Sequence, residues 1–282
     1  MINKIIFIVV KILNYSLLFH TSIDDNFDTI EKMEQVSHVN VRISLITIPF
    51  GSRIFYFLTY KKEGCIFFEK ENFNSFFVLD YDLKWGRKKE DIIESLVNDY
   101  KIHIDNQPIE KIKNQDEFLK QKISENNDSM STVRNKITHY TTIMLALTGA
   151  LTYLYTKISI ADLSNYLSLF FCYLLIIITA QIINLALFLR KGMMVSSFYQ
   201  SSFKDLKNSS YKHELTKSLY RDWLAKNDDV RYFSGIVKNS EKYLYRAICI
   251  GIIAFIIITL SSGSSSEIKT EIFLSVPDTH II

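Results

Sequence analysis

Two acidic residues separated by one position, Asp80 and Asp82, are the side chains in this sequence most suited to binding a metal ion or to catalysis. On a strand, residues i and i+2 face the same side, and two carboxylates placed in this way can hold a divalent cation. The sequence nearby supplies no histidine to complete such a site. Solvated acids are also common where a strand passes into a loop. A metal-dependent hydrolase using Asp80 and Asp82 is therefore our third-ranked hypothesis.

Other residues with reactive side chains are isolated in the sequence. His103 and Asp105 form a doublet without a nucleophile motif, and the glycines of the N-terminal half form no phosphate-binding loop. The three cysteines show no metal-ligand spacing and no disulfide framework (Cys65, Cys172 and Cys249). We therefore expect a protein that is not an enzyme, with no catalytic residue, metal or cofactor.

Three apolar runs dominate the second half of the chain. Lys136 and Lys157 bracket 20 uncharged residues, which as a helix span about 30 Å, the thickness of the hydrocarbon core of a membrane. Tyr166–Leu189 contains 24 residues without a charge, and Ala247–Leu260 contains 14. The sequence predicts an integral membrane protein with three transmembrane helices, the first two forming a hairpin.

Basic residues flank these runs on one side. Residues 190–246 contain 12 Lys and Arg against 6 Asp and Glu, whereas residues 1–136 contain 19 against 20. The positive-inside rule therefore predicts a cytoplasmic N-terminal domain and an extracytoplasmic C-terminus. The flanking residues that carry this prediction are Lys136, Arg190, Lys191, Lys242 and Arg246.

Within the runs the polar residues are uncharged. Thr141, Thr148 and Thr152 share one stripe of the first run, and Gln181 and Asn184 share one face of the second. We expect these two faces to meet and form interhelical hydrogen bonds, with a pore stripe exposed on oligomerisation as the alternative. No Asp, Glu, Lys or Arg lies near a midplane, which argues against a pump or a proton-coupled transporter.

The N-terminal half contains strand patterns. Residues 39–45 alternate apolar and polar side chains, Pro49–Gly51 marks a turn, and Arg53–Tyr60 is aromatic-rich. With Cys65–Glu69 and Phe76–Tyr81 they predict a four-stranded antiparallel meander. Adjacent aromatic residues on these strands point to opposite faces, so half of them lie outside the core. This favours a protein interaction surface over a nucleic-acid platform.

Helices should follow the strands. Glu90–Tyr100 has one apolar face, and Pro108 precedes a second, charged helix at Glu110–Ser124. The fold class is therefore α+β: a small N-terminal meander with helices, then an all-α membrane region with a cytoplasmic helical bridge. The chain is expected to begin with a leader at 1–32, amphipathic or poorly ordered, with a membrane-crossing signal anchor as its alternative. A cytosolic α+β domain at 33–125 follows. The remaining units are a transmembrane hairpin at 132–190, a bridge at 191–245, a third span at 246–263 and an extracytoplasmic tail at 264–282.

Polar segments are expected to interrupt the helices. Asn126–Ser131 (NNDSMS) reads as a hinge before the first span. Lys207–Ser210 and Asn227–Asp229 read as breaks that divide the bridge into two or three helices.

The order of these parts over Glu110–Leu260 resembles small bacterial membrane effectors of the SLATT type, which are associated with nucleotide-signalling and phage-defence systems. The shared features are a lead helix, the hairpin 137–189 and the long cytoplasmic helices. The abundance of Ile, Lys, Asn, Phe and Tyr also suits an AT-rich bacterial genome. The resemblance implies a membrane-perturbing effector with a cytosolic module.

Three functional hypotheses follow. In the first, the cytosolic domain senses a small-molecule ligand or a protein partner and couples it to the membrane helices of a homo-oligomer, perturbing the lipid bilayer. In the second, the chain is a passive membrane anchor or assembly factor that docks a partner protein. The third is the hydrolase described above.

Overall fold

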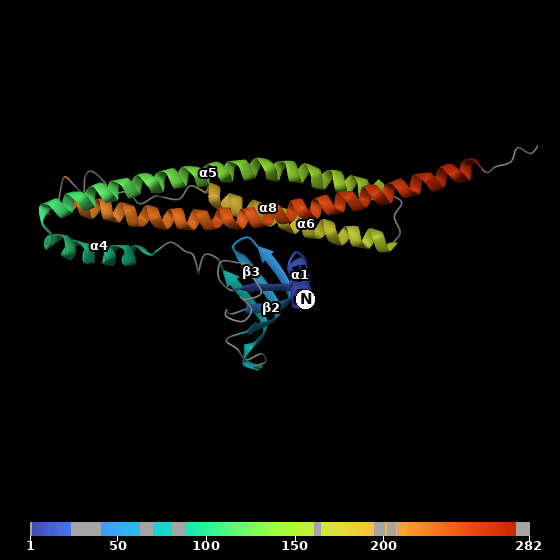
Figure 1. Ribbon diagram of the computed structural model, residues 1–282, viewed down its shortest axis with the longest axis horizontal. Coiled ribbons are helices and arrows are strands. Elements are labelled where there is room, and N and C mark those ends of the chain that lie inside the picture. The colour runs from blue at the N-terminus through green and yellow to red at the C-terminus, as the bar shows by residue number, and fades with distance from the viewer. Residues whose placement is uncertain are drawn as a thin grey trace, which may run out of the picture.

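The computed structural model describes residues 2–23, 41–62, 70–80, 88–160, 165–194, 201, 207 and 209–274. It confirms the α+β class: a four-stranded antiparallel sheet precedes a set of long helices (Figure 1). The helices α5, α6 and α8 run side by side along the longest dimension, and the sheet lies against one side of them (Figure 1).

The sheet is a meander whose strands are adjacent in their sequence order. Its strands are β1 (His20–Ile23), β2 (Val41–Phe50), β3 (Arg53–Lys62) and β4 (Phe73–Asp80), with a short 3-10 helix, η1 (Lys70–Asn72), before β4. The second, third and fourth strands match the alternating segments of the sequence. The first strand falls in the segment that we had assigned to the leader, and the strand predicted at Cys65–Glu69 lies outside the described residues.

A local distortion determines which side chains of the sheet are buried. Leu58 adopts a φ of 47°, in the left-handed region, which is uncommon for a branched side chain. Arg42 and Ser44 are buried on one side of this point and Thr47 on the other, although the intervening Leu45 is exposed. The strand pairing continues through it, from Ser44 opposite Thr59 to Ile46 opposite Phe57. The distortion thus turns both halves of the sheet toward the helices.

The helices are longer than predicted. They are α1 (Ile2–Leu13), α4 (Glu90–Asp105), α5 (Ile109–Ile160), α6 (Asn165–Met193) and α8 (Glu214–Leu274). The start of α5 directly after Pro108 agrees with the prediction, because a proline has no N–H to contribute at a helix start.

The hinge predicted at Asn126–Ser131 is not present, because α5 continues through it without interruption. Neither glycine nor proline occurs between Ile109 and Thr148. Serine and threonine hydroxyl groups of this segment hydrogen-bond to carbonyl groups of the same helix. Ser129 donates to the Glu125 carbonyl at 2.9 Å and Thr132 donates to the Asp128 carbonyl at 3.1 Å. Such local bonds satisfy short polar side chains within a helix.

The break predicted at Asn227–Asp229 is likewise wrong, because α8 joins the helical bridge to the third apolar run as one helix of 61 residues. Asp228 accepts a hydrogen bond from the Lys88 amide at 2.6 Å, and Asp229 is buried. Tertiary contacts therefore use these polar residues. Because α8 continues past Leu260, it also lengthens the 14-residue apolar run, which by itself is short for a span.

Helix α4 packs against α8 and lies away from the sheet (Figure 1). Tyr100 stacks on Tyr220 with ring centroids 3.9 Å apart, and Glu94 pairs with Arg221. We had expected α4 to complete the core of the N-terminal domain. An amphipathic pattern shows that one face is buried but does not show which element covers it.

Two apolar clusters hold the bundle together. The sheet-side cluster joins Ile54, Tyr56 and Leu79 of the sheet to all three long helices. The end cluster contains Leu154, Phe171, Ile177, Ile178, Ile182, Ala247, Ile250, Ala254 and Ile258 and lies among the same helices beyond the sheet. The core of the sheet is thus continuous with the core of the bundle.

A proline in the segment predicted as a hinge tests the continuity of α5. Ser129→Pro removes a helical N–H and should lower the free energy of unfolding by about 3 kcal/mol or more. Ser129→Ala, its matched control, should change it by well under that amount. Thermal unfolding followed by circular dichroism in detergent measures both, and equal stability of the two variants would contradict a continuous helix.

Candidate functional site

The β2–β3 turn is fixed to the middle of the bundle by one asparagine of α6. The Asn184 side-chain oxygen accepts a hydrogen bond from the Gly51 amide at 2.7 Å, and its nitrogen donates to the Pro49 carbonyl at 3.0 Å. The same nitrogen lies 2.7 Å from the Ala180 carbonyl of its own helix. Asn184 is 1% exposed, so these bonds replace all of its contact with water.

Gly51 is required at this turn for two reasons. Its φ of +57° is in the left-handed region, which glycine adopts without steric cost. A Cβ added there would also lie 3.2 Å from the Leu187 Cβ of α6. The turn therefore approaches the helix as closely as a backbone without a side chain allows.

Beneath the sheet lies a row of buried polar side chains. His20, Ser22, Ser44 and Thr47 are each at most 5% exposed. Ser22 and Tyr56 share a hydrogen bond of 3.2 Å between their hydroxyl groups. The remaining buried polar atoms, His20 Nδ1, Ser44 Oγ and Thr47 Oγ1, have no hydrogen-bond partner among the described residues. Such atoms are costly in a protein interior.

Basic residues surround this row. The Arg42 guanidinium lies 3.5 Å from the centre of the Phe77 ring and donates to Thr59 Oγ1 at 3.2 Å. Burial, together with the positive charges of Lys242 and Arg246 on α8, holds the pKa of His20 well below its ordinary value of 6.5. His20 is therefore neutral at pH 7, and its protonation would oppose the contact between the sheet and α8.

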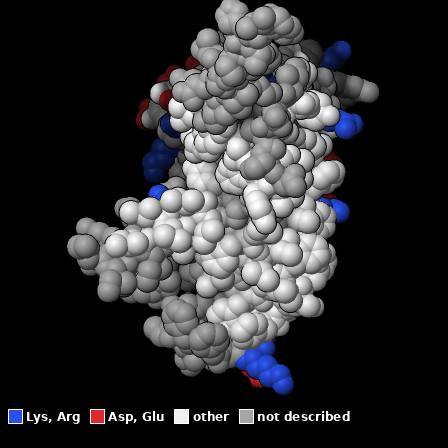
Figure 2. Space-filling view, turned by 90° about the vertical axis from the view of Figure 1, so that its right-hand side faces the viewer, with Lys and Arg blue, Asp and Glu red and all other residues white. Residues whose placement is uncertain are grey.

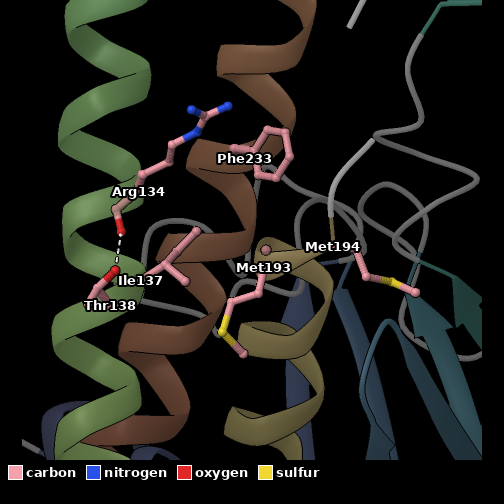
Figure 3. Close-up of a pocket in the computed structure, with 7 residues that line it drawn as sticks. Arg134, Ile137, Thr138, Met193, Met194 and Phe233 are labelled. Carbon is pink, nitrogen blue, oxygen red and sulfur yellow. Dashed lines mark hydrogen bonds between the residues drawn. The ribbon is translucent and has the colours of Figure 1, made fainter. Parts of the chain in front are cut away.

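A pocket of about 360 Å³ opens between α5, the end of α6 and α8 (Figure 3). Its walls are mainly apolar and sulfur-containing, and Arg134 adds one guanidinium. Thr138 donates to the Arg134 carbonyl at 3.2 Å (Figure 3). The pocket can accept a small apolar or weakly acidic molecule. Its lining residues are Arg134, Ile137, Thr138, Gly192, Met193, Met194 and Phe233.

The predicted polar faces of the first two runs do not meet. Thr148 and Thr152 are exposed and donate to carbonyl groups of their own helix, at 2.9 and 3.1 Å. Thr141 donates to the Ile137 carbonyl at 2.8 Å. Gln181 is buried on α6, and Asn184 binds the sheet. Thr148 and Thr152 therefore face outward, whereas Thr141 is partly buried and its hydroxyl lies 4.0 Å from the Met193 sulfur of α6.

The predicted basic flanks have different environments. Lys136 pairs with Glu241 of α8 at 3.1 Å, and Arg190 is exposed. Lys191 and Lys242 are partly buried. Arg246 is 9% exposed, with its guanidinium 5.2 Å from the centre of the Tyr15 ring. Only part of this set is therefore available to lipid headgroups.

The acidic pair is not assembled in the part of the chain that the structure describes. Asp80 accepts a hydrogen bond from Arg53 at 3.0 Å within a salt bridge, and Asp82 lies outside the described residues. Among those described, no group of three or more His, Cys, Asp or Glu side chains is placed to hold a metal ion.

Two helices, α6 over Tyr166–Met193 and α8 within Glu214–Ser261, are long and apolar enough to cross a membrane. The first predicted span, on α5, does not reach this level of apolarity, because its threonines and tyrosines lower its mean hydropathy. The face seen from the end where α8 projects carries its charges only at the margins (Figure 2). Large exposed apolar side chains of α6 and α8 include Leu169, Phe170, Ile176, Ile252, Ile253, Phe255, Ile256 and Leu260.

Comparison of the chain with protein-family models, curated proteins and solved structures finds no match. The candidate functional site is the contact of the β2–β3 turn with Asn184 together with the buried polar row beneath the sheet, and it is defined by its geometry. Sequence reasoning missed its central residues, His20 and Gly51. The Pro49–Gly51 turn signal indicated where the hairpin would reverse, but nothing in the sequence links that turn to Asn184.

A methyl group added at Gly51 tests the sheet–helix contact. Gly51→Ala must adopt a strained φ and displace Leu187, so we expect a loss of about 1–2 kcal/mol in the free energy of unfolding. Gly149→Ala is the matched control, since a Cβ there meets nothing within 4 Å, and it should change stability by about 1 kcal/mol or less. Chemical unfolding in detergent compares them. A loss at Gly149 equal to that at Gly51 would contradict the close approach.

The buried histidine predicts a dependence of stability on pH. Because the pKa of His20 is lowered in the folded protein, the unfolded chain binds more protons below about pH 6.5, and stability falls with acidification. Between pH 7.5 and 5.5, proton uptake by His20 should therefore favour the unfolded chain, and the free energy of unfolding should fall with the pH.

The measurement is the free energy of unfolding of the unsubstituted protein and of His20→Gln, each determined at both pH values. His20→Gln should lack this part of the acid destabilisation. Identical pH dependence in the two proteins would show that His20 titrates normally and is not buried in its neutral form.

Proposed function

We propose that this chain is a non-enzymatic integral membrane protein in which the sheet senses a small-molecule ligand or a protein partner and transmits its state to the membrane helices. The proposed location is a bacterial inner membrane, with the sheet in the cytoplasm and the end of α8 outside. The observation that carries the proposal is the division of the bundle into a charged half and an apolar half, with the sheet docked where they join.

The lengths of the helices support this membrane placement. The 20 residues from Asn165 to Asn184 span about 28 Å from the first Cα to the last in a helix, close to the hydrocarbon thickness. On α8, residues 247–266 contain no charge over 20 positions, or about 30 Å. The docked turn at Asn184 and the buried Arg246 would then both lie near the cytoplasmic boundary.

The third crossing, by α5, begins later than the sequence suggested. Lys136 and Tyr140 both bind Glu241 of α8, so this part of α5 lies beside a charged segment of its neighbour. The membrane-embedded part of α5 therefore starts near Met144, which packs against both apolar clusters. Lys157 lies 5.7 Å from the centre of the Tyr153 ring and reaches the outer headgroups from there.

Coupling between sensor and membrane follows from the shared core. The sheet contacts α6 at Asn184 and α8 through the cluster that contains Tyr243 and Leu244. A ligand that moves the sheet must therefore move the same two helices at the boundary. In the proposed homo-oligomer, this movement perturbs the bilayer.

The aromatic outer face of the sheet favours the second candidate, an anchor or assembly factor. Phe76 is 51% exposed and lies between Phe55 and Phe57, with centroid distances of 6.2 and 5.2 Å. Phe73 is 54% exposed beside Tyr60. Such a rigid aromatic patch suits docking of a partner protein. A hydrolase at Asp80 and Asp82 is the least supported candidate.

Leakage from dye-filled liposomes tests the coupling. Because the docked sheet holds α6 and α8 together at the boundary, Gly51→Ala should loosen that contact and raise dye release above that of the unsubstituted protein. Gly149→Ala should match the unsubstituted protein. Both variants are first shown to insert by flotation. Equal release from all three proteins would contradict the proposed coupling and favour the anchor.

A further inference from the structure

Helix α1 presents its most apolar stripe to the surroundings. Ile5, Ile8, Val9 and Ile12 are 53%, 57%, 47% and 64% exposed. Their spacing of i, i+3, i+4 and i+7 places them on one side of the helix, a pattern that normally faces a core. A protein surrounded only by water would lose stability by leaving this stripe uncovered.

The orientation of the stripe is fixed by the segment that follows α1. Asn14 is buried, donates to Thr21 Oγ1 at 3.0 Å and accepts from the Thr21 amide at 2.6 Å. The Thr47 amide of β2 donates to the Leu17 carbonyl at 3.0 Å. These contacts join the end of α1 to the sheet, so the helix is positioned by folded structure on one side and open on the other.

The position of α1 matches the boundary inferred from the long helices. The Tyr15 ring lies against Arg246, the last charged residue before the apolar part of α8. Leu17 packs on the end cluster, which contains Ala247 and Ile250. Figure 1 shows α1 beside the sheet, on the side toward the end of α5 and the start of α6, and lying across the long axis of the bundle.

We propose that α1 is an interfacial helix that lies in the plane of the cytoplasmic leaflet, with its apolar stripe among the acyl chains. This inference rests on the proposed crossing of the membrane by the bundle. The partner is lipid because the stripe lies at the level where the exposed surface of the bundle becomes apolar. Lys11 is exposed, 5.6 Å from the centre of the Phe7 ring, and extends toward headgroup phosphates.

The placement gives the sheet a second connection to the bilayer. Asn14 and Thr21 connect α1 to β1, and β1 carries His20 at the contact with α8. Lipid packing around α1 is thereby transmitted to the buried row beneath the sheet. The interfacial helix holds the sheet at a fixed depth while ligand or partner acts on it.

Depth-dependent fluorescence quenching on the full chain tests this proposal. The background carries Cys65→Ser, Cys172→Ser and Cys249→Ser, and a single cysteine is introduced by Ile8→Cys, Ile256→Cys or Ile102→Cys. The three isoleucines are 57%, 51% and 65% exposed, so they are matched in chemistry and exposure. Each protein is labelled with bimane in phosphatidylcholine–phosphatidylglycerol nanodiscs that contain lipids with nitroxide either near the headgroup or at the acyl-chain centre.

The label at position 8 should be quenched several-fold more by the shallow nitroxide than by the deep one. The label at position 256, nine residues beyond Ala247 and so about 14 Å deeper, should show the reverse. The label at position 102 on α4 should be quenched by neither. Circular dichroism confirms that each variant is folded.

The remaining outcomes separate the two proposals. Deep quenching at 256 without quenching at 8 would overturn the interfacial helix and leave the crossing intact. Stronger quenching at 8 by the deep nitroxide would also overturn it, because α1 would then be buried in the bilayer. No quenching at 256 would reject the crossing, and shallow quenching at 8 in that case would support surface attachment by α1 alone.

Discussion

Helix α8 joins a charged half and an apolar half along one uninterrupted length. Its first half packs through Tyr220, Arg221 and Asp228 against α4 and the segment before it. Beyond Arg246 it carries no charge for 20 residues. Residues 214–274 contain no proline, and both parts belong to one continuous helix. The rest of the structure is therefore arranged around a single transition point on this helix.

The sheet is placed at that transition and depends on it. Its core is shared with α5, α6 and α8, and its β2–β3 turn is held by Asn184. An asparagine with both polar groups satisfied by backbone atoms is stable where an unpaired one would be costly. The same point of α6 thus receives the sheet on one side and continues into the apolar half on the other. This geometry makes the sheet a structural part of the bundle and not an attached module.

The sequence predicted the elements that follow a simple period. Strands β2, β3 and β4, helix α4 and the start of α5 after Pro108 all appear near the expected residues. Strand β1 was missed because its four residues, HTSI, are short and polar, and only pairing with Val41–Ser44 makes them a strand. The hinge at Asn126–Ser131 failed for the opposite reason: local polarity suggested a break, but packing against α8 maintains the helix. The position of Asn184 against Gly51 joins residues 133 apart, and no local pattern contains such information.

Accessibility of spin labels along α8 tests the central claim most directly. Residues 231, 238, 245, 252 and 256 are exposed along the helix and take single labels in lipid bilayers. We expect a polar nickel reagent to reach the labels at 231, 238 and 245, and oxygen dissolved in lipid to dominate at 252 and 256. The change should fall between 245 and 252, next to Arg246. Contact with the polar reagent at all five positions would contradict a membrane boundary on this helix.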